Sequence, residues 1–182
     1  NGKMSKSLGN LYTIDDLIQK GYDPLAFRYF VLGAHYRSKI NFTFEALDAA
    51  QNALVKLREM VREWDEPDVG CADLEEKFFT VMNDDLSTPQ ALAIMWELVN
   101  ADLPSSAKAE SLLRMDQVLG LRLKEYVARP LEIPAEVQRL VDEREEARQK
   151  KDWKRSDELR LAVEGLGYTL EDTEQGARVK RT

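Results

Sequence analysis

Residues 43–64 contain the stretch of sequence that decides the fold, TFEALDAAQNALVKLREMVREW. Thr43 has a side chain that suits a helix N-cap, and the acidic, proline-containing residues 65–68 end the pattern. Between these ends the apolar residues recur at spacings of three and four, which places them on one side of an α-helix. They are Leu47, Ala50, Leu54, Leu57, Val61 and Trp64. The stretch predicts a long amphipathic helix, one seam of a helical bundle.

Three more helices are predicted after this one, joined by short connections. They extend from about Leu74 to Asp84, from Pro89 to about Val99, and from about Lys108 to Leu119. Thr88 is the predicted cap of the second of these helices. Residues 43–125 together predict an antiparallel bundle.

Two shorter helices are predicted ahead of the bundle. Thr13 suits the N-cap of the first, which is expected to end at Gly21. Asp23 suits the cap of the second, with Pro24 at its first position. Apolar residues surround this second helix nearly completely as far as Leu32, so we expect it to be buried.

Residues 128–134, ARPLEIP, form a proline-bracketed linker and the best candidate for a domain boundary. A charged helix is predicted from Pro134, and Asp152 suits the cap of a second helix. The residues after it alternate like two strands of a small hairpin, at 168–171 and 177–180. The predicted fold is mainly α: an antiparallel helical bundle followed by a small C-terminal α+β domain with a hairpin.

The chain of 182 residues is 43% apolar and 32% charged, which is ordinary for a soluble globular protein. No apolar run approaches the roughly 20 residues of a membrane helix, so no membrane partner is expected. The single cysteine, Cys71, excludes an internal disulfide and fits a cytoplasmic protein. One histidine, His35, and one distant cysteine are too few ligands to predict a metal site.

The net charge of −7 argues against nucleic-acid binding by the chain as a whole, but the charge is unevenly distributed. Residues 1–128 carry 14 basic and 20 acidic side chains, whereas residues 129–182 carry 12 and 13. Six basic residues crowd into positions 148–160: Arg148, Lys150, Lys151, Lys154, Arg155 and Arg160. A phosphate-binding patch and a solvated helix face both fit this pattern, and charge alone favours the solvated face.

Residues 3–9 read KMSKSLG and combine residue types that bind a polyphosphate. Lys3 and Lys6 supply positive charge, the serines supply hydroxyl donors, and Gly9 lets the backbone approach a ligand. Two flexible terminal lysines are the alternative interpretation. Because no nucleotide-binding fold precedes this loop, we expect the chain to be the C-terminal piece of a larger enzyme.

The loop resembles the KMSKS motif of class I aminoacyl-tRNA synthetases. Four further segments look like cysteinyl-tRNA synthetase and occur in that family's order: YDPLAFRY at 22–29, HYRS at 35–38, MNDDLSTP at 82–89 and LEDT at 170–173. The resemblance covers essentially the whole chain. It implies three parts: the lysine loop with the tail of a stem-contact region at 1–42, a tRNA-bracing helical bundle at 43–128, and an anticodon-recognition domain at 129–182.

The resemblance implies an enzyme that activates cysteine with ATP and transfers it to tRNA(Cys). The cysteine carboxylate would attack the α-phosphate, and pyrophosphate would leave. By the motif, Lys6 binds the ATP phosphates and Lys3 is a supporting charge. The catalytic fold and a zinc site that selects cysteine would lie outside this chain, so we expect the chain alone to be inactive. A cytoplasmic ligase is implied.

Trp153 is the natural platform for an unstacked RNA base. The apolar stripe of its helix is Leu159, Ala162, Val163 and Leu166. At about 100° per residue, Trp153 points off this stripe and Asp157 shares its face. In the resembled family an arginine, a tryptophan and two aspartates read the anticodon GCA, and the matching positions are Arg148, Trp153, Asp157 and Asp172. The alternatives are a tryptophan packed on the hairpin and aspartates that serve as surface or capping residues.

Two other functions stay open on the sequence alone. A related ATP-dependent cysteine ligase that acts on an aminosugar shares the lysine loop, but it has no use for an anticodon domain at residues 129–182. A stand-alone RNA-binding module would use the same C-terminal residues without catalysis.

Overall fold

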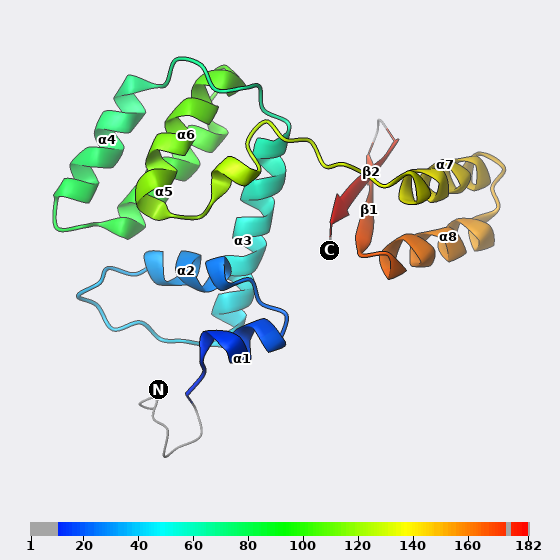
Figure 1. Ribbon diagram of the computed structural model, residues 1–182, viewed down its shortest axis with the longest axis horizontal. Helices are drawn as coiled ribbons and strands as arrows, with labels where there is room; N and C mark the ends of the chain where they lie inside the picture. The colour runs from blue at the N-terminus through cyan, green and yellow to red at the C-terminus, as the bar shows by residue number, and fades with distance from the viewer. Residues whose placement is uncertain (1–10, 174–175, 182) are drawn as a thin grey trace. The chain divides into compact units, whose positions relative to one another are not determined.

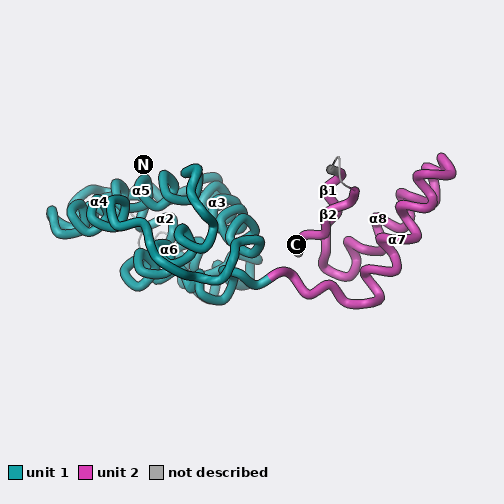
Figure 2. The backbone as a smooth tube through the Cα atoms, turned by 90° about the horizontal axis from the view of Figure 1, so that it is seen from above, with its two compact units in different colours: residues 1–129 teal, residues 130–182 magenta. Residues whose placement is uncertain are grey.

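The computed structural model describes residues 11–173 and 176–181 (Figure 1). Lys3 and Lys6 lie outside the described residues. The chain divides into two compact units, residues 1–129 and residues 130–182 (Figure 2). Each unit has its own hydrophobic cluster, and each is described separately.

The first unit is built from helices. They are α1 (Ile14–Gln19), α2 (Pro24–Leu32), α3 (Phe44–Arg62), α4 (Ala72–Asn83), α5 (Thr88–Asn100), α6 (Ser105–Leu119) and the short 3₁₀ helix η2 (Leu123–Glu125). Helix α2 packs on α3, and α4, α5 and α6 pack on one another (Figure 1). The predicted helical bundle is therefore confirmed.

Local side-chain chemistry explains where several helices begin. Thr13 and Asp16 form a reciprocal capping box at α1, in which the Asp16 carboxylate accepts a hydrogen bond from the Thr13 N–H at 2.7 Å. Asp23 accepts from the Leu25 N–H at 2.7 Å, and Thr43 accepts from the Ala46 N–H at 3.1 Å. These three caps confirm the prediction.

The predicted cap of α5 is wrong by one residue. Ser87 is the N-cap, and Thr88 is the first helical residue. The Thr88 hydroxyl donates to the Ala34 carbonyl oxygen at 3.5 Å instead of capping its own helix. The reason is the turn before the helix, where Asp85 and Leu86 adopt positive φ angles of 55° and 52° and set where the helical backbone can start.

Helix α3 is the centre of the first unit. Leu47, Leu54, Leu57 and Val61 from its predicted seam are buried, with at most 1% of each residue exposed. Around them the buried apolar residues of all six α-helices and of the η2 region form one continuous cluster. The prediction that the 43–64 stretch is the seam of a bundle is confirmed.

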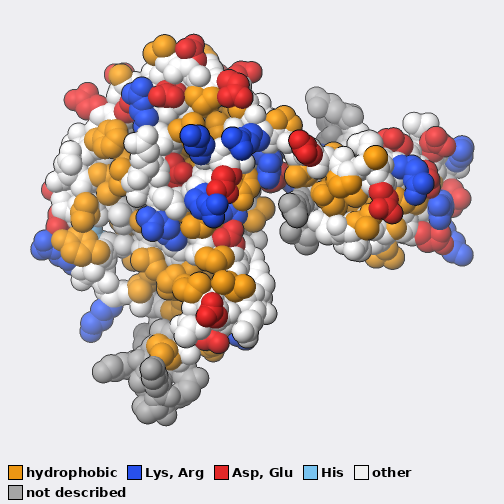
Figure 3. Space-filling model, in the orientation of Figure 1, with side chains coloured by type: hydrophobic (Ala, Val, Ile, Leu, Met, Phe, Trp, Pro, Cys, Tyr) orange, Lys and Arg blue, Asp and Glu red, His pale blue; other side chains and the backbone are white. Residues whose placement is uncertain are grey.

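Helix α2 is less buried than its composition predicts. Ala26 is its buried residue, and Val31 is 43% exposed. The apolar side chains that α3 does not cover line a groove of about 440 Å³ between α1 and α2, with Tyr12, Ile14 and Phe30 among its walls. Hydrophobic side chains gather over this part of the unit in Figure 3.

The end of helix α6 is defined by Gly120 and by two charged residues, Arg28 and Asp116. Gly120 has a φ of 65°, and a Cβ there would lie 2.8 Å from the Arg28 guanidinium, so glycine fits both the conformation and the space. The Asp116 carboxylate accepts from the Leu121 and Leu123 N–H groups, both at 2.7 Å. Burial raises the pKa of Asp116, although these two hydrogen bonds work against the shift.

The second unit contains α7 (Ala135–Gln149), α8 (Trp153–Gly165), β1 (Tyr168–Thr173) and β2 (Gly176–Arg181). The two helices pack on each other and the strands form an antiparallel hairpin in which Leu170 lies opposite Val179 (Figure 1). Val137, Val141, Val163 and Leu170 are the buried residues of its hydrophobic cluster. The predicted small α+β domain with a hairpin is confirmed.

The buried side of α8 is narrower than the predicted stripe. Leu159 and Val163 are buried as expected, but Ala162 and Leu166 are exposed and Ser156 is buried in their place. Helix α7 and strand β1 cover only one side of α8, so the stripe that they bury is shifted toward Ser156. Among the described helices of both units, none has the length and apolar character that crossing a membrane requires.

Candidate nucleic-acid interface

The turn between α7 and α8 presents Trp153 to solvent. Lys151 adopts a left-handed φ of 59°, and its N–H donates to the Arg148 carbonyl oxygen at 2.9 Å, which closes the turn. Asp152 then caps α8 by accepting from the Arg155 N–H at 3.1 Å, as predicted. Trp153 is the first helical residue and is 59% exposed.

The exposure of Trp153 separates two interpretations of this residue. A tryptophan packed on the hairpin would be covered, whereas most of this side chain is open to solvent. Asp157 follows four residues later on the same helical face and is also exposed. An exposed ring with a carboxylate one turn away offers a stacking surface and a hydrogen-bond acceptor.

Arg148 and Asp172 are brought into direct contact from distant positions in the sequence. The Arg148 guanidinium at the end of α7 forms an ion pair with Oδ1 of Asp172 in strand β1. Arg144, one turn earlier on α7, donates from Nη2 to both carboxylate oxygens of Asp172, at 3.0 Å to Oδ1 and 3.2 Å to Oδ2. The aspartate therefore lies between two arginines.

The charges around Asp172 control its ionisation. Burial works to raise its pKa, but the hydrogen bond and charge of Arg144, and then those of Arg148, outweigh burial and hold the pKa below its ordinary value. Asp172 is thus a carboxylate near neutral pH and can only accept hydrogen bonds.

Most of the six clustered basic residues already have acidic partners. Arg155 pairs with Glu143 and Glu158, and Lys150 pairs with Glu146. Lys151 and Lys154, on either side of Trp153, are exposed and have no ion pair within the described part of the chain. Figure 3 shows basic and acidic side chains mixed at this end of the second unit. Two unpaired lysines beside an exposed ring are suited to binding the phosphate backbone of an RNA.

Sequence reasoning missed Arg144. It is 3% exposed and lies on the buried side of α7 with Val137 and Val141. The signal in the sequence is its spacing: Arg144 lies three residues after Val141 and four before Arg148, which places all three on one face of the helix. A charged residue on an apolar stripe predicts a buried ion pair, although the sequence does not name the partner.

A second polar cluster lies in the first unit and is satisfied internally. His35 Nε2 lies 3.0 Å from the Asp85 carbonyl oxygen, and Tyr36 and Arg37 both donate to Oδ1 of Asp85, at 2.6 and 2.8 Å. The hydrogen bond to Asp85 raises the pKa of Tyr36, against a smaller opposing effect of Arg37. These residues tie the loop after α2 to the turn before α5, so the contact of His35 is a structural one.

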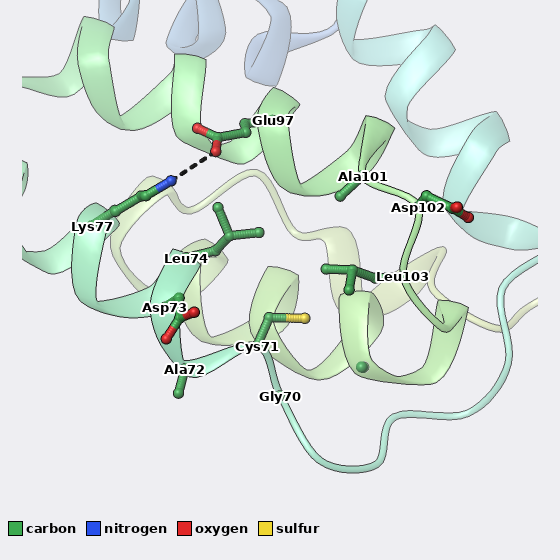
Figure 4. A pocket seen from close by; sticks show the side chains of 11 residues that line it. Gly70, Cys71, Ala72, Asp73, Leu74, Lys77, Glu97, Ala101, Asp102 and Leu103 are labelled. Carbon is green, nitrogen blue, oxygen red and sulfur yellow. Dashed lines mark hydrogen bonds and ion pairs between the residues drawn. The ribbon is translucent and has the colours of Figure 1, made fainter.

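A cleft of about 680 Å³ lies between α4, α5 and the start of α6. Figure 4 shows Lys77 of α4 and Glu97 of α5 pointing toward each other, and their charged atoms are 2.9 Å apart. Asp73 and Asp102 also line the cleft, and its wall includes the half-buried Cys71. With its lysine paired and two further acids, this cleft is a poor site for RNA phosphate.

The described residues do not provide a metal site. Nowhere in residues 11–173 and 176–181 do three His, Cys, Asp or Glu side chains gather closely enough to hold a metal ion. The zinc site that the resemblance implies is expected outside this chain.

Comparison with known proteins found one matching family for each end of the chain. The family described as "tRNA synthetases class I (C) catalytic domain" matches residues 1–52, and "Cysteinyl-tRNA ligase anticodon binding domain" matches residues 131–179. The second match contains Arg148, Trp153, Asp157 and Asp172. The chain is therefore similar to cysteine–tRNA ligases in both matched segments.

Curated cysteine–tRNA ligases are similar to nearly the whole of this chain. Cysteine–tRNA ligase 1 of Burkholderia lata is 44% identical over 179 residues, which are 97% of this chain and 38% of the relative. The ligase of Borrelia hermsii is 39% identical over 98% of this chain and 42% of its own length. The ligase of Opitutus terrae is 40% identical over 96% of this chain and 38% of its own length.

The chain spans about two fifths of the length of these curated cysteine–tRNA ligases. Its match to an anticodon-binding domain over residues 131–179 disfavours the cysteine ligase that acts on an aminosugar. The roles of the individual site residues and the three-part division at residues 42 and 128 remain predictions.

Proposed function

We propose that this chain serves a cytoplasmic cysteine–tRNA ligase by recognising the anticodon of tRNA(Cys) with its second unit. Trp153 stacks on an anticodon base, and Asp157 and Asp172 accept hydrogen bonds from base edges. Arg148 contacts a base edge or a phosphate, and Lys151 and Lys154 bind the RNA backbone. Stacking supplies affinity with little sequence preference, whereas the carboxylates supply selection because they accept hydrogen bonds only.

The observation that carries this proposal is the exposure of Trp153 at the start of α8. A tryptophan that is 59% exposed loses the stabilisation that burial would give a large ring. Its two flanking lysines lack ion pairs within the described ranges, and the match to an anticodon-binding domain covers this helix. Proteins bind single-stranded RNA with exposed aromatic rings that stack on the bases and nearby cations that contact the phosphates.

We further propose that Lys3 and Lys6 assist cysteine activation by ATP. When the cysteine carboxylate oxygen bonds to the α-phosphorus, the bond to the bridging oxygen breaks and pyrophosphate leaves with added negative charge. An ammonium group beside that oxygen stabilises the transition state more than bound ATP. Lys6 is the principal charge and Lys3 supports it.

The RNA-binding proposal is tested with Trp153→Ala in the 182-residue chain. We expect binding of a tRNA(Cys) transcript to weaken by about 1–3 kcal/mol, because one base loses its stacking partner. Leu161→Ala is the matched control, since Leu161 is a 66% exposed apolar residue of the same helix. Equal affinities of both variants and the unchanged chain would refute the stacking role.

The adenylation proposal is tested with Lys6→Ala in a polypeptide that also contains the rest of the catalytic domain. We expect ATP–pyrophosphate exchange to slow by at least tenfold while tRNA affinity stays constant. An unchanged exchange rate would count against Lys6. Should RNA binding succeed in the first experiment and exchange be insensitive here, a non-catalytic RNA-binding module would be the better description.

A further inference from the structure

Arg144 has a position that is costly for a charged side chain. It lies on the buried side of α7, and its Nε atom has no hydrogen-bond partner among the described residues. A buried guanidinium is tolerated when its charge is paired, and Arg144 pairs with Asp172 and, at 3.3 Å, with Glu145. An apolar residue would fill the same place on α7 without this cost, so the charge itself needs an explanation.

Asp172 connects this buried charge to the surface. Its side chain is 41% exposed, whereas that of Arg144 is 3% exposed. Oδ1 of Asp172 accepts a hydrogen bond from Arg144 at 3.0 Å and also forms the ion pair with Arg148, while the hydrogen bond that Oδ2 accepts among the described residues is the longer Arg144 contact of 3.2 Å. The carboxylate is thus held from inside the unit and keeps one lightly used oxygen.

We infer that Arg144 is a positioning residue for RNA reading, which fixes the Asp172 carboxylate so that Oδ2 and the Arg148 guanidinium meet a base together. This inference rests on the proposed function. Nη2 of Arg144 lies within hydrogen-bond distance of both oxygens of Asp172, and the planar guanidinium is stiffer than the flexible ammonium group of a lysine, so Arg144 sets the orientation of the carboxylate. A carboxylate that is fixed before binding loses less conformational freedom when the RNA arrives.

Loss of Arg144 has a specific consequence in this arrangement. Without the inner arginine, Asp172 can turn so that Arg148 occupies both of its oxygens. The acceptor for the base and the outer cation would then neutralise each other. The lysines beside Trp153 would still bind phosphate, so selection among anticodons is lost while general RNA affinity persists.

The test measures discrimination by the 182-residue chain. Binding constants are determined at one salt concentration for a tRNA(Cys) transcript and for three transcripts that each carry one altered anticodon base. We expect Arg144→Met to reduce the discrimination ratio about tenfold at one anticodon position, with no change in the salt dependence of binding. Arg139→Met is the matched control, because it removes the same charge from a 69% exposed position on the same helix.

A double-mutant cycle separates positioning from a general structural role. If Arg144 acts through Asp172, Arg144→Met adds no further loss of discrimination to Asp172→Asn. An additive loss, or normal discrimination in Arg144→Met, would overturn the inference. If Arg144→Met fails to fold by circular dichroism, Arg144→Lys replaces it, with an expected loss of about threefold, and normal discrimination there overturns the inference equally.

The proposed function fails in a different way. In that case the unchanged chain itself binds all four transcripts equally, before any substitution is made. Discrimination by the unchanged chain together with an insensitive Arg144→Met refutes the inference alone.

Discussion

The two units of this protein are stabilised by different interactions. In the first unit, twenty-one buried apolar residues of the described chain form one cluster, and the fully buried Phe78 is its largest side chain. In the second unit the corresponding cluster has four buried residues, none larger than leucine. There the buried Arg144 of α7 and its partner Asp172 of β1 tie this helix to the hairpin.

This difference follows from size. A unit of 53 residues has too little interior to bury many apolar side chains, so each specific polar contact is a larger part of its stability. The same contacts hold charged groups in fixed positions near the surface. The larger unit is therefore a packed scaffold, whereas the smaller unit holds charged side chains in fixed positions near its surface.

The largest effect is expected from Phe78→Ala in the first unit. Removing this fully buried ring leaves a cavity and should lower the free energy of unfolding by about 3–5 kcal/mol, measured by urea denaturation. Phe79→Ala is the control, since its ring is adjacent in sequence and 38% exposed, and should cost about 1 kcal/mol. Hydrogen exchange should place the loss in residues 11–129 alone. Equal losses from both substitutions would show that burial does not dominate this unit.

A smaller effect is expected from Asp172→Asn in the second unit. The substitution leaves the Arg144 charge without its carboxylate, and because Asp172 is partly exposed the loss at pH 7 should be about 1–2 kcal/mol. The pKa of Asp172 is lowered in the folded chain, so its stabilising contribution is complete above the unfolded pKa of about 3.9.

That contribution is lost as the pH falls through the folded pKa. The stabilities of Asp172→Asn and the unchanged chain should therefore converge in acid, as measured by hydrogen exchange of residues 130–173 from pH 7 downward. A difference that stays constant through this range would contradict the assigned ion pair. Glu158→Gln is a suitable control, because Glu158 is a 52% exposed partner of Arg155 in the same unit.

The smallest effect is expected from Lys77→Ala in the first unit. The pair of Lys77 and Glu97 is 57% and 51% exposed, so its removal should change the free energy of unfolding by less than about 0.5 kcal/mol. Addition of 1 M sodium chloride should make the variant and the unchanged chain indistinguishable. A loss comparable to that from Asp172→Asn would remove the contrast between the two units.

Local patterns predicted much of the fold correctly. The seam of α3, the caps at Thr13, Asp23 and Thr43, and the hairpin after α8 all follow from residues within a few positions of one another. The predicted exposure of Trp153 also follows from helical periodicity alone. These features need no knowledge of the partner elements.

The predictions that were wrong concern which side chains are buried by an element distant in the sequence. The apolar residues of α2 predict full burial, but α3 covers only part of that helix. The stripe of α8 is shifted toward Ser156 because α7 and β1 pack on one side of it. In both cases the periodicity gives the side chains that can be buried, and the neighbouring element selects which of them are.

By itself the sequence determined the helices, the hairpin, the resemblance to cysteine–tRNA ligases and the exposed tryptophan, because these depend on short-range pattern and on matching segments. Only the tertiary structure decided that Arg144 and Arg148 hold the same carboxylate, since the 23 residues between Arg148 and Asp172 must fold back before the charges meet. A charge on a helix specifies that a partner is needed, and the packing of the hairpin determines which residue it is.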